Sequence, residues 1–385
     1  MDEAMEKKRV IPFVLFVFFL MGFCNFVGMA AVYMQTDFKL NDVEVGILPL
    51  LVFVWYLLLA LPFRRTIKMI GRKVLAFSGI SVMAIGLVLP VLTYSVAGCM
   101  LAFSLIGCGS VFVYMALEPL ICSLFSRTGQ TVFPVYGWMI QAISSFLGPF
   151  VTAVSCVLWG KWYFSLCVFA VITILYGGKV FSCPINESCV ISSFGVRSFK
   201  KFSGTRGFWI LFTTMVCING IDVGMNIIIP KLLMERCGNT VQDAVLGSGF
   251  YFVCKAFGCL MSTMCRAHMN IRGGMLLQVS ALLLSLFVLC FMYGEYGILS
   301  LSGIIGMGLS FLYFKIDEMV FTTYQESGYE RVVMMQAAMC GGAFVPLLMG
   351  AASMVYGSLL GALSVLLVCF SVVVFIFLLK RNSFN

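Results

Sequence analysis

The chain has 385 residues, of which 61% are hydrophobic and 11% are charged, and its mean hydropathy is +1.05. A soluble protein has no core large enough to hide this much apolar surface, whereas repeated runs of about 20 apolar residues match the thickness of a bilayer. The composition therefore excludes a soluble domain and predicts an all-α polytopic membrane protein. The net charge of +9 needs an explanation of its own.

Apolar windows separated by polar breaks predict twelve membrane-spanning helices. The predicted spans are 10–34, 45–63, 74–95, 97–125, 131–158, 162–181, 208–234, 244–265, 273–293, 298–324, 332–356 and 359–379. The longest break, at 182–207, is polar and basic. We therefore expect an N-terminal six-helix half at 1–181, a cytosolic basic linker at 182–207 and a C-terminal six-helix half at 208–385.

The basic residues divide unequally between the two sides of this predicted topology. Of the 25 lysines and arginines, two lie near the middle of helices, four lie in loops or at helix ends on one side, and the other 19 lie in segments or at helix ends on the side of both termini. Cytoplasmic segments carry an excess of Lys and Arg, so we expect both termini in the cytosol, with the plasma membrane as the location. The net charge is then a topology signal, and nucleic-acid binding is not expected. The four basic residues on the outer side are Lys39, Lys161, Lys231 and Arg236.

Similar residues recur at matching places in the two predicted halves. The matches are Gly107, Gly109, Tyr114 and Glu118 with Gly306, Gly308, Tyr313 and Asp317 in helices four and ten, Gln141 with Gln336 in helices five and eleven, and Met21, Asn25 and Gly28 with Met215, Asn219 and Asp222 in helices one and seven. Three matches in the right order indicate two pseudo-symmetric repeats. Such repeats are typical of the major facilitator architecture, whose central cavity opens alternately to either side.

Several segments resemble one transporter family. Residues 341–350 read Gly-Gly-Ala-Phe-Val-Pro-Leu-Leu-Met-Gly, and residues 18–23 read Phe-Phe-Leu-Met-Gly-Phe. Both are similar to segments of the fucose/galactose/glucose proton-symporter family, and Gln141 and Lys255 fall on its helix-five Gln and helix-eight Arg. The resemblance implies a major facilitator fold that carries a hexose.

The chain departs from that family at its carboxylates. The family's helix-one acid, tied to proton coupling, aligns with Gly28, and its helix-four Glu aligns with Tyr114. In the loop between helices two and three, Ile67 stands in place of the superfamily's Asp. The resemblance therefore implies a cytosolic gate loop that is held differently here. The retained members of this loop are Lys68, Gly71, Arg72 and Lys73.

Two ionisable residues lie near the midpoints of consecutive predicted helices, Asp222 in helix seven and Lys255 in helix eight. A charge at membrane depth costs roughly 2.5 to 3.5 kcal/mol on insertion scales, so it marks a candidate pathway or binding site. An ion pair would offset part of that cost. We expect the two residues to pair, either as a structural element or as a site for substrate or protons.

A second group of charges lies in the cytosolic halves of predicted helices four and ten, where side chains can reach the interface. Lys315 and Glu318 are three residues apart and share one helix face. We expect a gate salt bridge between them, with a substrate contact as the alternative. The whole group is Glu118, Lys315, Asp317 and Glu318.

Amide side chains inside the helices offer hydrogen bonds to a polar solute. Such amides also join membrane helices to one another, at about 1 kcal/mol each. Gln141 is the leading site candidate because the resemblance and the internal repeat both fall on it. Tyr114 either stacks on a sugar ring or fills the core. The five amides are Asn25, Gln141, Asn219, Asn226 and Gln336.

These features predict an alternating-access transporter of a small polar solute, with a monosaccharide favoured by the resemblance. The alternatives are an anionic metabolite, such as a nucleotide or organic phosphate held by Lys255 and Lys315, and a non-transporting membrane receptor or chaperone on the same scaffold. Protons are a candidate second partner. A charged Lys255 would stabilise the Asp222 carboxylate and make it a poor proton carrier, so facilitated diffusion is favoured over symport.

Motifs of other function classes are missing from the sequence. It contains no paired-cysteine metal pattern, no phosphate loop ending in Gly-Lys-Ser/Thr and no nucleophile elbow. An ATP-driven pump or a membrane enzyme is therefore not expected, and neither is a cofactor or a metal. The expected partners are the solute and the lipid bilayer.

Overall fold

The structure is a computed structural model that describes residues 2–60, 62–124, 127–178, 204, 206–264, 271–323 and 328–379. Regular structure in these residues is helical throughout. The predicted linker at 182–207 lies almost wholly outside the described residues, so the domain boundaries remain predictions.

Nine elements form the first half of the chain, and seven form the second. The first half comprises α1 (Asp2–Met21), η1 (Gly22–Asn25), α2 (Phe26–Phe38), α3 (Asp42–Leu58), α4 (Phe63–Ile70), α5 (Arg72–Leu92), α6 (Val96–Leu124), α7 (Arg127–Trp159) and α8 (Phe164–Gly177). The second half comprises α10 (Arg206–Cys237), α11 (Val241–Met264), α12 (Ile271–Leu289), α13 (Glu295–Thr323), α14 (Gly328–Ala338), α15 (Gly341–Tyr356) and α16 (Leu359–Leu379).

These elements correspond to the twelve predicted spans. The first span is α1, η1 and α2 in series, the eleventh is α14 and α15, and α4 is a short additional helix. Nine spans in the described part of the chain are long and apolar enough to cross a membrane, and α3, α8 and α12 are shorter. The predicted fold of twelve helices in two six-helix halves is confirmed.

Two helix ends differ from the prediction for identifiable reasons. Helix two ends at Leu58 rather than at residue 63, because Pro62 follows and disfavours a helical residue before it. Helix nine ends at Leu289 rather than at 293. There, the Arg236 guanidinium donates hydrogen bonds of 2.7–2.9 Å to the carbonyls of Leu289, Cys290 and Met292 and so satisfies the end of α12.

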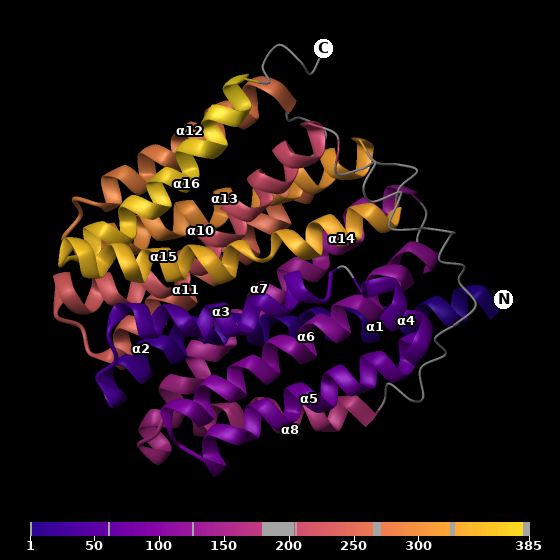
Figure 1. The fold of residues 1–385 in the computed structure, drawn as a ribbon, viewed down its shortest axis with the longest axis horizontal. Coiled ribbons are helices and arrows are strands. Elements are labelled where there is room, and N and C mark those ends of the chain that lie inside the picture. Colours follow the sequence, from indigo (N-terminus) through magenta and orange to yellow (C-terminus); the bar gives the residue numbers. More distant parts are fainter. Residues whose placement is uncertain are drawn as a thin grey trace.

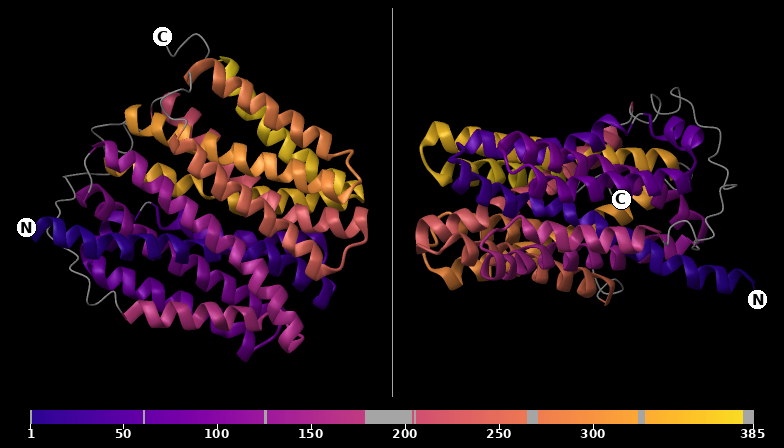
Figure 2. Two further views of the ribbon diagram at one scale, coloured as in Figure 1. Left: turned by 180° about the vertical axis from the view of Figure 1, so that it is seen from behind. Right: turned by 90° about the horizontal axis from the view of Figure 1, so that it is seen from below.

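The two halves lie side by side, and the axes of their helices are roughly aligned with one another (Figures 1 and 2). The start of α1 and the end of α16 lie on one face, as an even number of crossings requires. We call this the terminal face and the opposite one the far face. The halves meet mainly where α7 packs on α11 and where α3 packs on α15.

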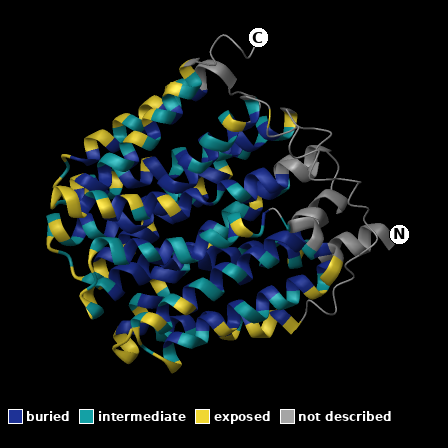
Figure 3. Ribbon diagram, viewed as in Figure 1, coloured by how far each residue is buried: buried dark blue, intermediate teal, exposed yellow. Residues whose placement is uncertain are grey.

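Buried residues fill the centre of the molecule, and exposed ones gather at its periphery (Figure 3). One apolar cluster comes mostly from α1 to α8, and the other comes from α10 to α16. The first cluster also takes in Val223, Ile227 and Val245 of the second half. The core is therefore continuous across the seam between the halves.

One carboxylate joins the two halves near the far face. Asp42 is the first residue of α3, and a capping box between Asn41 and Glu44 closes the N-terminus of this helix. Lys231 Nζ of α10 donates to Asp42 Oδ1 at 2.7 Å, and Ser353 Oγ of α15 donates to Oδ2 at 2.6 Å. Two helices of the second half thus hold one residue of the first.

The backbones of α3 and α15 touch beside this carboxylate. A Cβ atom on Gly350 would lie 2.2 Å from the carbonyl oxygen of Asp42, and one on Gly46 would lie 3.0 Å from the carbonyl oxygen of Pro346. Small residues at membrane interfaces allow this approach and the dispersion contacts that come with it. The far-face seam is therefore closed by both glycine packing and an ion pair.

Replacing Gly350 by Ala tests the glycine packing. The added methyl would meet backbone at 2.2 Å, which side-chain rotation cannot relieve. We expect a loss of about 1–3 kcal/mol from overpacking, more than the 0.5–1 kcal/mol that Ala contributes as a better helix former. The measurement is the melting temperature of the purified protein in detergent. Ala351→Val, on the exposed side of the same helix, is the control and should leave the melting temperature nearly unchanged.

Replacing Asp42 by Asn tests the ion pair. The change leaves Lys231, whose side chain is 13% exposed, without its anionic partner. The expected cost is about 1–3 kcal/mol, below the 3–5 kcal/mol of a fully buried pair because Asp42 is 23% exposed. The melting temperatures of Asp42→Asn, Lys231→Met and the double variant give the coupling between the two residues. Strictly additive effects would contradict a contribution from the pair.

Candidate functional site

A cavity lies in the seam between the two halves. The centres of water molecules can occupy about 80 Å³ of this cavity. One water molecule needs about 10–15 Å³ of such space, so the cavity has room for several. Its lining comes from both halves. Six of the eight residues predicted to bind substrate line it, namely Asn25, Tyr114, Gln141, Asn219, Asp222 and Lys255.

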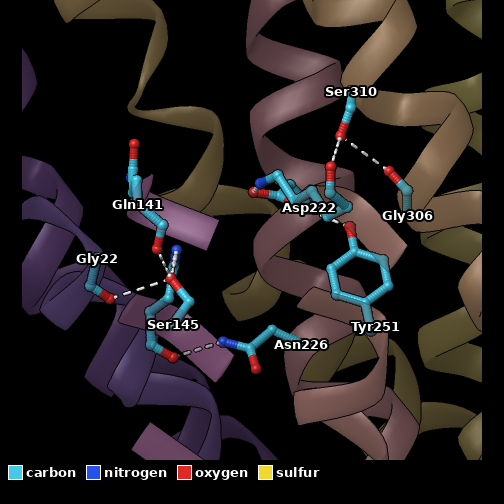
Figure 4. A network of polar contacts seen from close by, with 10 residues as sticks. Gly22, Gln141, Ser145, Asp222, Asn226, Tyr251, Gly306 and Ser310 are labelled. Carbon is cyan, nitrogen blue, oxygen red and sulfur yellow. Dashed lines mark hydrogen bonds and ion pairs between the residues drawn. The ribbon is translucent and has the colours of Figure 1, made fainter. Parts of the chain in front are cut away.

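The first wall of the cavity is built around a break in the first span. Between α1 and α2 the chain tightens into the 3₁₀ segment η1, which leaves backbone carbonyls without their α-helical partners. The Ser145 hydroxyl shares its hydrogen between the carbonyl of Gln141 at 2.8 Å and that of Gly22 at 3.3 Å (Figure 4). Asn226 Nδ2 donates to the carbonyl of Asn25 at 2.6 Å. The Asn25 side chain in turn donates to Ser145 at 2.8 Å.

The eleventh span is broken in the same way. After α14 ends at Ala338, a turn at Met339 and Cys340 precedes α15. Asn219 Nδ2 donates to the carbonyl of Ala338 at 3.3 Å and so supplies a partner at the break. Asn25 and Asn219, which the internal repeat pairs, therefore both line the cavity beside a helix break.

The opposing wall carries an ion pair. Lys255 Nζ of α11 donates to Asp222 Oδ2 of α10 at 2.5 Å, and the Tyr251 hydroxyl donates to Oδ1 at 2.7 Å. The side chains of Lys255 and Asp222 remain 20% and 17% exposed, and both line the cavity. The two residues thus form the ion pair that their positions on consecutive helices suggested, and their role at the site stays a prediction.

Gln141 and a set of aromatic side chains complete the lining. The Gln141 amide is partly exposed and makes no hydrogen bond to another described residue, so it is available to a solute. Trp138 and Tyr313 meet edge to face, with ring centroids 4.7 Å apart. The lining aromatic residues are Phe18, Phe53, Tyr114, Trp138 and Tyr313.

Two predicted binding residues lie outside the lining. Asn226 is buried and donates to Asn25, as described above. Gln336 is buried too, and its Nε2 donates to the carbonyl of Tyr56 at 3.2 Å. Both amides join the halves to one another rather than facing the cavity.

Apart from Asp222, the predicted gate residues whose side chains the structure describes are not among those that line the cavity. Lys315 Nζ pairs with Glu318 at 3.0 Å, and Asp317 is buried nearby on α13. The side chains of Glu118 and Lys68 lie outside the described residues. Gly71 joins α4 to α5 with a φ of +81°, followed by the buried Arg72 and by Lys73. The gate role of all these residues stays a prediction.

Sequence reasoning missed Tyr251 and the far-face partners of Asp42. Tyr251 lies four residues before Lys255, so the two share a helix face, and this spacing could have indicated a common partner. Asp42 and Lys231 gave no such signal, because residue 42 falls between two predicted spans and Lys231 was counted with the basic residues of the outer side.

Comparison with known proteins was informative at the level of family and fold. Residues 13–325 match the profile of the Major Facilitator Superfamily. Among curated protein sequences, none matches the chain at a significant level.

Solved structures that resemble this one include three transporters. The E. coli fucose:proton symporter FucP is 15% identical, with a TM-score of 0.69 and 97% and 99% of the two chains covered. The nucleoside transporter NupG is 12% identical, with a TM-score of 0.73 and 97% and 100% covered. A bacterial homologue of the human lysosomal transporter Spinster, in an inward-facing state, is 12% identical, with a TM-score of 0.70 and 98% of each chain covered.

At these identities the three structures establish the fold alone, and the profile match over most of the chain establishes the family. The chain belongs to the major facilitator superfamily of membrane transporters.

Proposed function

We propose that this transporter carries a small neutral polar solute, with a monosaccharide as the leading candidate, by facilitated diffusion. The observation that carries the proposal is the combination of a free Gln141 amide, aromatic side chains and an internally neutralised ion pair around one cavity. Amides bind hydroxyl groups, and aromatic faces cover the apolar side of a ring. Rocking of the two halves would then expose the cavity to either side.

The pairing of the lysines argues against the anionic alternative. A nucleotide or organic phosphate would need free positive charge, but Lys255 is bonded to Asp222 and Lys315 to Glu318. An anion would have to displace a carboxylate from one of these pairs in order to bind. Lys315, moreover, does not line the cavity.

A nucleoside is the second candidate, favoured by the aromatic lining. Five aromatic side chains are among the described residues that line the cavity, and flat bases stack on such rings. A nucleoside presents both hydroxyl groups for Gln141 and a flat base for Trp138 or Tyr313. The solved relatives include a fucose symporter and a nucleoside transporter, and both named solutes are neutral.

We further propose that the terminal face is cytosolic, that the chain resides in the plasma membrane and that its halves divide at the linker 182–207. Support for the orientation comes from the 19 basic residues on the side of the termini against four on the other side.

Counterflow in liposomes tests the solute. Liposomes that contain the purified protein and are preloaded with unlabelled hexose should accumulate labelled hexose transiently. Gln141→Ala should raise the KM about fivefold, the equivalent of one hydrogen bond of about 1 kcal/mol. Ile143→Ala, on the exposed side of the same helix, is the matched control and should transport normally. The panel includes a nucleoside and a phosphate ester.

The panel separates the alternatives. Transport of the nucleoside alone would select the second candidate, and transport of the phosphate ester alone would select the anionic one. A protein that carries no solute but retains a bound ligand or partner protein would instead be a receptor or chaperone.

A proton gradient tests the transport mode. Asp222 is the one carboxylate among the described residues that line the cavity, and Lys255 and Tyr251 occupy both of its oxygens. We therefore expect an inwardly directed proton gradient to leave net uptake of the carried solute unchanged within about twofold. Accumulation above the external concentration, abolished by a protonophore, would contradict facilitated diffusion.

A further inference from the structure

The carboxylate on the cavity wall is held at two points from a single helix face. Tyr251 and Lys255 are one helical turn apart on α11, and each occupies a different oxygen of Asp222. The aromatic ring of Tyr251 is fully buried. Asp222 therefore cannot turn away from Lys255 without breaking the bond to Tyr251.

Helix α13 packs against the segment of α11 that carries Tyr251 and Lys255. A Cβ atom on Gly306 would lie 2.9 Å from the Tyr251 ring, so the glycine of the repeated helix-four and helix-ten motif leaves room for that ring. The Ser310 hydroxyl donates to the carbonyl of Lys255 at 2.8 Å, and the carbonyl of Gly306, 3.2 Å away, shares the same hydrogen (Figure 4). All these residues belong to the second half, so rocking of the halves would carry them as one unit.

The pair also determines the charge of the cavity. Among the described residues that line it, Asp222 and Lys255 are the only two that carry a formal charge at neutral pH, and their charges cancel. The other titratable groups there are the neutral Tyr114, Tyr313 and Cys259. An ion entering such a site would lose its hydration without gaining a free counter-charge.

We propose that the Asp222–Lys255 pair, aligned by Tyr251, is a charge filter that restricts this transporter to neutral solutes. This inference deepens the proposed function and rests on it for the identity of the neutral solute. Asp222 and Lys255 are the specificity-determining residues, and Tyr251 is a positioning residue that acts through Asp222.

The filter makes reciprocal predictions for its two charges. Asp222→Asn leaves Lys255 unopposed and should raise the affinity for a hexuronate, relative to hexose, about tenfold. Lys255→Gln leaves Asp222 unopposed and should do the same for a hexosamine at slightly acidic pH, where its amine is protonated. The double variant restores neutrality and should favour neither ion. Affinities are measured by equilibrium binding to monodisperse protein.

Tyr251→Phe tests the positioning role without removing a charge. Release of one carboxylate oxygen should loosen the pair and raise the hexuronate-to-hexose affinity ratio about threefold. Tyr33→Phe removes another buried hydroxyl, one that contacts Cys156 away from the cavity, and should leave the ratio unchanged. If neither single charge variant is monodisperse, Tyr251→Phe alone decides the question.

The charge filter and the proposed function are contradicted by different results. Unchanged ratios in Asp222→Asn, Lys255→Gln and Tyr251→Phe would overturn the filter even if the wild-type protein carries hexose. A wild-type protein that binds no hexose would overturn the sugar proposal. The filter would then be tested by comparing the absolute affinities of the variants and the wild type for hexuronate and hexosamine. A wild-type protein that prefers the hexuronate would overturn both.

Discussion

The absence of water in a bilayer core governs this structure, because every polar group inside it needs a partner from the protein. Helices satisfy their own backbone, but the first and eleventh spans are each interrupted beside the cavity. Asn226, Ser145 and Asn219 reach across from other helices to the carbonyls at these interruptions. The irregular backbone that shapes the cavity thus depends on amides and hydroxyls elsewhere in the chain.

This dependence means that a polar residue in a membrane helix can serve the fold and the site at once. Asn25 and Asn219 face the cavity while their side chains also bond to neighbouring helices. The Gln141 amide bonds to no other residue that the structure describes, which leaves it as the most available of the three. Residue type alone does not separate these uses, because they differ in what lies opposite each amide.

The sequence was sufficient for the parts of the structure that depend on one-dimensional patterns. Apolar run length predicted the twelve spans, and equal depth on consecutive helices predicted that Asp222 and Lys255 meet. Of the residues that the internal repeat matches, Tyr114 and Tyr313 both line the cavity. Of Gln141 and Gln336, only the first faces the cavity. The two halves share a backbone pattern, but each packs against a different neighbour.

Contacts between distant helices could not be read in the same way. Asp42 begins α3 beside a capping box between Asn41 and Glu44, which is usual at exposed helix ends and indicates nothing about a distant partner. Its partners lie 189 and 311 residues further along the chain. No local pattern encodes such distances, and the pairing became visible only once α3 was placed against α15, which itself packs on α10.

The two ion pairs differ in what a rocking motion would require of them. Asp42 belongs to the first half and Lys231 and Ser353 to the second, so opening at the far face must break these bonds. Asp222, Tyr251 and Lys255 all belong to the second half, so the same motion can leave them intact. One pair is therefore placed where its strength opposes opening. The other is placed where it can keep the charge of the cavity constant while the halves move.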